Sequence, residues 1–329
     1  MGKKPSFVAF AAKLILNVHD LNNEAVAGNV TDIRLMDFVT RDNKVITAPA
    51  VSGRMLKHFH LTHMTALELS ELNPKLCDGC KVGEPIRPGI FKEGKVEELA
   101  DISEEDAIKN CIICDAHGFL VAQAQALRRT SRALFSWLVP VLESEYTSKQ
   151  VLHSKVSRQI TMRVTGKEER KEGEEGKEGE ERKVQMLFSK SYASGFYSFV
   201  SVLDLAGLGY VESEAKQVLE LDEWKRRATL AVKAYIPLLT GHLGASLSHA
   251  LPHAECCELL AVISNSHLVT VPFSPIYGEK YAEEYLGLLP KSDDFKAYTF
   301  GFDVNGAERK KNINEIFDEI IKQITSATT

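Results

Sequence analysis

The sequence lacks any long apolar run. Its 329 residues contain no stretch near the roughly 20 consecutive apolar residues that a membrane-spanning helix requires. The first residues, MGKKPSFVAF, lack the apolar core and the small-residue cleavage site of a secretory signal. We therefore expect a cytoplasmic protein that makes no contact with a membrane.

Familiar catalytic signatures are also missing. The chain has no Walker loop, no nucleophile elbow, no H-E-x-x-H motif and no evident pair of carboxylates for acid–base chemistry. Asp32 and Asp37, just ahead of a basic segment, are the acidic residues best placed to act on a bound nucleic acid. Such residues more often cap loops or form salt bridges. The sequence thus predicts a protein that is not an enzyme.

An excess of positive charge is absent too. The formal net charge is −5, and the 44% hydrophobic and 26% charged residues are typical of a globular protein. Positive residues instead gather in two segments, residues 38–64 and 122–163, whereas acidic residues lie mostly elsewhere. Segregation of this kind can build a basic groove on an acidic protein, which is the electrostatic pattern expected for phosphate binding.

Cysteine is scarce but patterned. Cys77, Cys80, Cys111 and Cys114 form the spacing C-x2-C-x30-C-x2-C, with four soft ligands in two chelating pairs as tetrahedral zinc requires. A reducing cytosol disfavours disulfides, so we predict a structural zinc that crosslinks a segment with few apolar residues. The alternatives are cysteine pairs that are merely buried or redox-active, and a site in which His117 replaces one thiolate.

The segment SGRMLKH at residues 52–58 predicts the start of a helix with Ser52 as its N-cap. A hydroxyl, free backbone amides and the side chains of Arg54, Lys57 and His58 would then share the first turns, where a phosphate can bind. The local sequence supports equally well a simpler interpretation, in which Ser52 only caps the helix and the cations are solvated.

Further cations follow in two places. Arg128, Arg129 and Arg132 form a compact basic cluster, and Lys155 and Arg158 lie on a predicted strand among hydroxyl side chains. Strand alternation places Lys155 and Arg158 on opposite faces of that strand. The two faces therefore cannot both belong to a core. All five side chains are candidate phosphate contacts.

The remaining pattern favours an α+β fold. The run at residues 166–183 contains only Glu, Lys, Arg and Gly, so we expect a disordered tip on a hairpin formed by its flanking strands. Residues 67–118 look like an insertion with little regular sheet. The order of elements suits one ferredoxin-like or RRM-like domain over residues 1–329. Strands are predicted at residues 6–19, 133–142, 151–164, 184–205 and 258–271, and helices from residue 52, within 214–247 and at 312–325.

Residues 35–38 (LMDF) and 48–60 (APAVSGRMLKHFH), followed by the cysteine-rich insertion and residues 128–132 (RRTSR), resemble the DevR-like CRISPR autoregulator family. The likeness covers nearly the whole chain in element order. Members of this family are backbone subunits of type I Cascade complexes, and the likeness is greatest to the archaeal type I-A branch. The resemblance implies a modified RRM palm of the RAMP superfamily, with inserted fingers or web region at residues 67–118 and a hairpin thumb at residues 151–190.

The resemblance also implies a role in antiviral defence and a set of partners. Copies of the subunit would form a helical filament along CRISPR RNA, hold its ribose-phosphate backbone and leave the bases free to pair with target DNA. Other Cascade subunits and a helicase-nuclease, which would do the cutting, complete the set. Carried over to this sequence, the RNA contacts would be Ser52, Arg54, Lys57, His58, Arg128, Arg129, Arg132, Lys155 and Arg158.

Two other functions stay open. The related backbone subunit of type III complexes cuts target RNA with an aspartate ahead of the equivalent helix, which would make Asp32 or Asp37 catalytic with Mg²⁺. The family's regulatory name suggests instead a transcriptional autoregulator that binds promoter DNA, although the sequence has no helix-turn-helix with a basic recognition helix. Metal-dependent cutting of complementary RNA would identify the first, and sequence-specific duplex binding the second.

Overall fold

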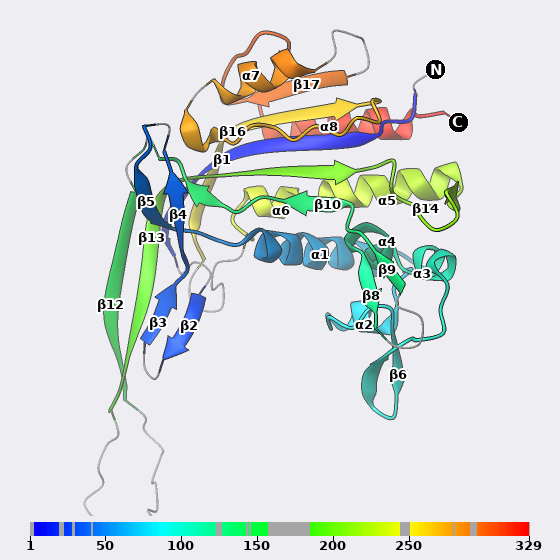
Figure 1. Ribbon diagram of the computed structural model, residues 1–329, viewed down its shortest axis with the longest axis horizontal. Coiled ribbons are helices and arrows are strands. Elements are labelled where there is room, and N and C mark those ends of the chain that lie inside the picture. The colour runs from blue at the N-terminus through cyan, green and yellow to red at the C-terminus, as the bar shows by residue number, and fades with distance from the viewer. Residues whose placement is uncertain are drawn as a thin grey trace, which may run out of the picture.

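The protein has a mixed α/β fold around one central sheet (Figure 1). The expected charged tip at residues 166–183 and Arg158 lie outside the part of the chain that the structure describes. The computed structural model describes residues 3–19, 23–27, 30–40, 42–122, 127–142, 144, 146–156, 185–243, 251–278, 280–289 and 295–328.

The sheet is built around β1 (Phe7–His19), the strand predicted at residues 6–19. It pairs antiparallel with β13 (Gln185–Asp204) on one side and with β16 (His253–Ser264) on the other. Residues 7–12 of β1 are all buried, because layers cover both faces of this central strand. The sheet order is β18-β17-β16-β1-β13-β3-β2, with β2 at Asn23–Ala27, β3 at Val30–Ile33, β17 at Phe295–Phe300 and β18 at Glu308–Arg309.

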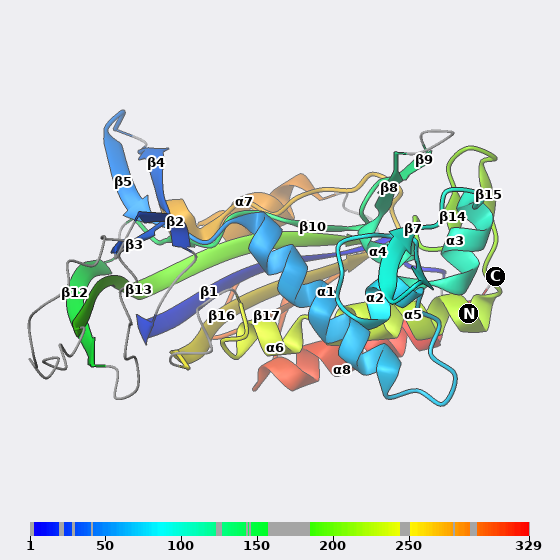
Figure 2. The ribbon, with the colours of Figure 1, turned by 90° about the horizontal axis from the view of Figure 1, so that it is seen from below.

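Helices pack on both faces of the sheet. One face carries α1 (Gly53–Leu69), α5 (Leu221–Lys233), α6 (Ile236–Leu239) and α8 (Ile313–Thr325), and the other carries α7 (Tyr281–Leu288) (Figure 2). On the four-helix side, the ring of Phe10 packs between Tyr235 and Phe317, with centroids 4.6 and 5.8 Å away. On the α7 side, Ala11 packs with Tyr285. The short helix η1 (Pro275–Tyr277) contacts β1 and β13.

β13 is shared between the sheet and a projecting hairpin. Its first half pairs antiparallel with β12 (Tyr146–Val156), from Tyr146 opposite Gly195 to Val156 opposite Gln185. The antiparallel pairing expected of the strands that flank the charged run is therefore present. Whether this hairpin acts as a thumb stays a prediction.

The prediction of a single strand at residues 133–142 is wrong. The chain instead forms β10 (Ala133–Phe135) and β11 (Val139–Pro140), which pair with β13 separately. Between them, the backbone of Leu138 exchanges two hydrogen bonds of 2.9 Å with Val51, which draws this segment to the start of α1. Sequence periodicity carries no information about such a long-range partner.

Residues 67–118 contain short elements that stay apart from the central sheet, as expected. The insertion and the β12–β13 hairpin project to the same side of the sheet, and α1 runs between them (Figure 1). The short elements in and after the insertion are α2 (Asp78–Lys81), β6 (Gly89–Lys92), β7 (Lys95–Glu98), α3 (Glu104–Asn110), α4 (Ile112–His117), β8 (Phe119–Val121) and β9 (Leu127–Arg129).

Several predicted boundaries shift. Of the helical region predicted at residues 214–247, the structure describes 214–243, and this part contains α5 and α6 as well as the short strand β15 (Lys216–Gln217). The strand predicted at residues 258–271 begins and ends earlier, as β16. α7, β17 and β18 were not anticipated. Two small hairpins complete the described elements, β4 (Leu35–Val39) with β5 (Val45–Pro49) and β14 (Tyr210–Val211) with β15 (Lys216–Gln217). Within the described ranges, every helix is too short or too polar to cross a membrane.

Because α1 approaches the backbone of residues 135–136 closely, we predict that replacing Gly53 in this helix by alanine destabilises the protein. A Cβ added at Gly53 would lie 2.5 Å from the Phe135 carbonyl oxygen. Gly53→Ala should therefore lower the free energy of unfolding by about 1–3 kcal/mol, although alanine normally favours a helix. Gly287→Ala in α7, where the added Cβ meets no atom within 4 Å, should be neutral or stabilising. Urea unfolding of both variants measures this, and equal stabilities would contradict it.

Candidate nucleic-acid interface

The start of α1 has the features predicted for it. The Ser52 hydroxyl accepts a hydrogen bond of 3.3 Å from the Met55 amide and caps the helix. No acidic residue occupies the first turn of this fully described helix. Arg54 and His58 are exposed and Lys57 is half-buried, and the charges of Arg54 and Lys57 add to the positive end of the helix dipole. Burial lowers the pKa of the Lys57 ammonium. This end of α1 can bind an anion.

Arg129 does not belong to such a surface. Its side chain has no exposed area and pairs with Asp115 at 2.6 Å and with Glu104 at 3.1 Å. The prediction that Arg129 contacts a phosphate is therefore wrong, because its guanidinium is fully used inside the protein. The guanidinium of Arg132 is also engaged in ion pairs within the protein. Only 10% of its side chain is exposed, and it pairs with Asp204 and Glu212.

The structure locates only some of the other side chains that were predicted to contact RNA. Arg128 is exposed on β9, next in sequence to the buried Arg129. Lys155 lies on β12, but its side chain is outside the described part, as is all of Arg158. The structure thus brings Ser52, Arg54, Lys57 and His58 together on one helix end and leaves the roles of Arg128, Lys155 and Arg158 as predictions.

A buried ionic network that the sequence did not reveal joins the insertion to the rest of the protein. One oxygen of Asp115 accepts hydrogen bonds from Arg129 and from the Gly209 amide, and the other accepts from Arg227 at 2.9 Å. The side chains of Asp115, Arg129 and Arg227 have no exposed area. The signal was present in ICDAHGF, where one acidic residue follows buried apolar positions and so requires cationic partners.

The four paired cysteines converge as predicted. Cys77, Cys80, Cys111 and Cys114 place their sulfur atoms within 4.8 Å of one another, with 3.9 Å between Cys77 and Cys114. Tetrahedral Zn–S bonds of about 2.3 Å imply S–S separations of about 3.8 Å, so this geometry could hold a metal ion. Hydrogen bonding with the Cys111 thiol lowers the pKa of Cys77 and raises the pKa of Cys80. Without a cation, thiols this close cannot all ionise.

His117 lies outside this cluster and pairs with His60. The Ala231 carbonyl can only accept, so His60 Nε2 donates to it at 2.9 Å, and His60 Nδ1 accepts from His117 Nε2 at 3.0 Å. Burial lowers the pKa of His60 to about 3, so both rings of this buried pair are neutral near pH 7. The arrangement makes His117 Nδ1 an acceptor, and it has no partner within the described chain.

Within the described residues, the two candidate catalytic aspartates do not form a common site. Asp37 is exposed on β4, where its carboxylate accepts a hydrogen bond of 2.6 Å from the Thr47 hydroxyl across the β4–β5 hairpin. Asp32 lies on β3, and its side chain is outside the described residues. The geometry of Asp37 fits a role in holding the hairpin.

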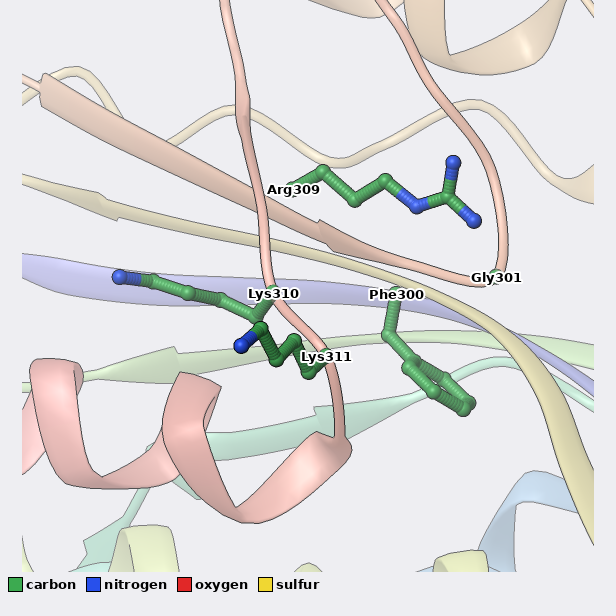
Figure 3. A pocket seen from close by; sticks show the side chains of 5 residues that line it. All are labelled: Phe300, Gly301, Arg309, Lys310 and Lys311. Atoms are coloured by element: carbon green, nitrogen blue, oxygen red, sulfur yellow. The ribbon is translucent and has the colours of Figure 1, made fainter.

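A basic hollow lies at the edge of the sheet formed by β17 and β18 (Figure 3). It has a volume of about 440 Å³ and is lined by Phe300, Gly301, Arg309, Lys310 and Lys311. The side chains of Arg309 and Lys310 point in different directions, and each pairs with a carboxylate, at 2.5 Å to Asp303 and 2.7 Å to Glu308. Cations that diverge and are already paired suit phosphate less well than the start of α1.

Comparison with known proteins settles the family. The family model described as "CRISPR-associated negative auto-regulator DevR/Csa2" matches residues 10–286. The chain belongs to the DevR/Csa2 family. The resemblance based on residues 35–60 and 128–132 is thereby confirmed at the level of family membership.

Known members and solved structures agree. A Methanocaldococcus jannaschii protein named "CRISPR-associated protein Cas7/Cst2/DevR" is 28% identical over 97% of this chain and 100% of its own length. "CRISPR-associated protein Cas7/Csa2 1" of Saccharolobus solfataricus is 27% identical over 88% of this chain and 87% of its own. A chain of a solved structure named "CRISPR RNA-guided surveillance complex, pre-nicking" shares the fold, with a TM-score of 0.61, 9% identity and coverage of 97% of this DevR/Csa2 chain and 100% of that one.

The Asp115 network predicts a large stability effect. Asp115→Asn removes the charge that compensates two buried arginines, so it should lower the free energy of unfolding by about 3–5 kcal/mol. Asp303→Asn breaks an exposed ion pair with Arg309 and should change stability by no more than about 1 kcal/mol. Urea denaturation compares the two, and similar losses would show that the buried network is not a major constraint.

Proposed function

We propose that this protein is a non-catalytic backbone subunit of a type I Cascade effector, and that copies of it polymerise along CRISPR RNA. The observation that carries the proposal is the start of α1 in a member of the DevR/Csa2 family, where cations and helix amides lie together with no acidic residue in the first turn and could bind an anion. The solved complex with the same fold is named an RNA-guided surveillance complex, which supports an assembly of this kind.

In this proposal the protein holds phosphates and leaves bases free. Arg54, Lys57 and His58 contact the guide backbone at the start of α1, and Ser52 keeps the helix amides oriented toward it. Pairing of the exposed guide bases with target DNA then supplies sequence specificity. The β12–β13 hairpin serves as a thumb and residues 67–118 as a fingers or web region, both on the side of the sheet where α1 lies.

RNA binding should depend on the start of α1. Lys57→Glu replaces a cation with an anion, so it should weaken binding to single-stranded RNA by about 10- to 100-fold and flatten the salt dependence. Lys95→Glu reverses an exposed charge at the β6–β7 turn and serves as the control. Fluorescence anisotropy over a range of salt concentrations measures both, and equal losses would remove α1 as the specific contact.

Copurifying nucleic acid tests the function itself. Protein coexpressed with a CRISPR array and partner subunits should carry small RNAs with repeat-derived ends and leave complementary RNA uncut in Mg²⁺. Absence of RNA would refute the proposal. Cutting that is lost in Asp32→Asn or Asp37→Asn would identify an RNA-cleaving backbone subunit, and tighter binding to one promoter duplex than to RNA would identify an autoregulator.

We also propose that the four-cysteine cluster binds structural zinc. Its four sulfurs leave no open ligand position for catalysis. The purified protein should contain one zinc per chain by mass spectrometry, and Cys111→Ser should lose the metal and lower Tm by about 10 °C or more, because metal binding and folding of the insertion are coupled. Cys257→Ser, outside the cluster, should keep the zinc. Metal retained in Cys111→Ser would contradict the assignment.

A further inference from the structure

A pair of buried histidines joins the insertion to the helices that cover the sheet. His60 on α1 has no exposed area, and His117 at the end of α4 is only 2% exposed. His117 Nε2 donates to His60 Nδ1 at 3.0 Å, and His60 Nε2 donates to the Ala231 carbonyl of α5 at 2.9 Å. These two hydrogen bonds link α4 of the insertion to α1 and, through α1, to α5.

Aromatic rings enclose the pair on the side of the sheet. The ring centroid of His60 lies 4.5 Å from that of Tyr235 and 5.5 Å from that of Phe135. The Tyr235 hydroxyl bonds with Ser201 at 2.8 Å and leaves the histidines alone. Burial in such surroundings favours the neutral imidazole, and it lowers the pKa of His60 to about 3 and that of His117 well below its usual value.

The charged groups that face the pair oppose its protonation as well. After burial, the charge of His63 lowers the pKa of His60. After burial and the charge of His60, three further basic groups lower the pKa of His117, namely Lys57, Arg87 and His58.

No carboxylate of the described residues forms a hydrogen bond with either ring. Asp115, two residues before His117 on α4, pairs with Arg129 and Arg227. Glu68 on α1 pairs with Arg226 at 2.6 Å. A proton taken up by either ring would therefore add a buried positive charge without a counter-charge.

Protonation would also disrupt the hydrogen bonding. The bond between the rings requires His60 Nδ1 as an acceptor, and a proton on this atom would set two donors against each other. The other basic nitrogen is His117 Nδ1, which is buried and has no partner among the described residues. An N–H group at that position would have no acceptor. Neither nitrogen can therefore take up a proton without cost while the two rings stay packed.

We propose that the His60–His117 pair is an acid-sensitive latch, which holds α4 against α1 and α5 while both rings are neutral and opens when they are protonated. Opening exposes the rings to water, where an imidazole takes up a proton near pH 6.5. Each ring that is neutral in the closed form and charged in the open form adds one proton to the opening reaction. Opening of the pair thus consumes two protons.

The direction of the pH effect follows from this balance. Because folding lowers both pKa values, the latch contributes its full stability above about pH 6.5 and loses it as the pH falls below that value. Each pH unit below 6.5 favours the open form by up to about tenfold per histidine, and by up to about 100-fold for the pair. For His60 this loss continues down to its folded pKa of about 3.

Urea unfolding of His117→Gln at a series of pH values tests the latch. The glutamine amide can replace His117 Nε2 as the donor to His60, and it does not titrate. Between about pH 6 and 5, the folding constant of the wild-type protein should fall up to about tenfold more than that of His117→Gln. Adding His60→Gln should remove about another tenfold. His267→Gln, which replaces an exposed histidine after β16, is the control and should keep the dependence of the wild-type protein.

The imidazole ¹⁵N shifts of the folded wild-type protein give a second measurement that does not depend on whether a variant folds. Both rings should be neutral Nε2–H tautomers at about pH 5.5, below the usual pKa of histidine. If either ring is charged in the folded protein at that pH, the latch is refuted. It is refuted as well if His117→Gln loses the same stability at neutral and acid pH, because the pair would then have only a structural role.

Discussion

The carboxylate of Asp115 is the group on which the placement of the insertion depends. It receives Arg129 from β9, Arg227 from α5 and the Gly209 amide, and all three ionic side chains are cut off from water. Desolvating such charges is expensive, and the network is tolerable only while every donor and acceptor is satisfied. Any displacement of the insertion would break several of these bonds at once. The Cys cluster is therefore held at a defined position beside α1.

The same network explains the distribution of charge at the surface. Three buried carboxylates already form ion pairs with arginines: Asp115 with Arg129 and Arg227, Glu104 with Arg129, and Glu68 with Arg226. These carboxylates therefore cannot neutralise the cations of α1. A chain of net charge −5 can thus present an electropositive region without being basic overall. The positive charge that matters is the part left unpaired after the fold has formed, and it cannot be obtained by counting residues.

That distinction sets the limit of what the sequence could predict. Periodicity and capping chemistry identified β1 and the start of α1, and spacing identified the four cysteines, because these signals are local. Arg129 looked like a surface cation because its partner Glu104 is 25 residues away and Arg227 joins the same network from another helix, through Asp115. α7, which covers the sheet, and β17, which belongs to it, were missed because such short elements carry little periodicity.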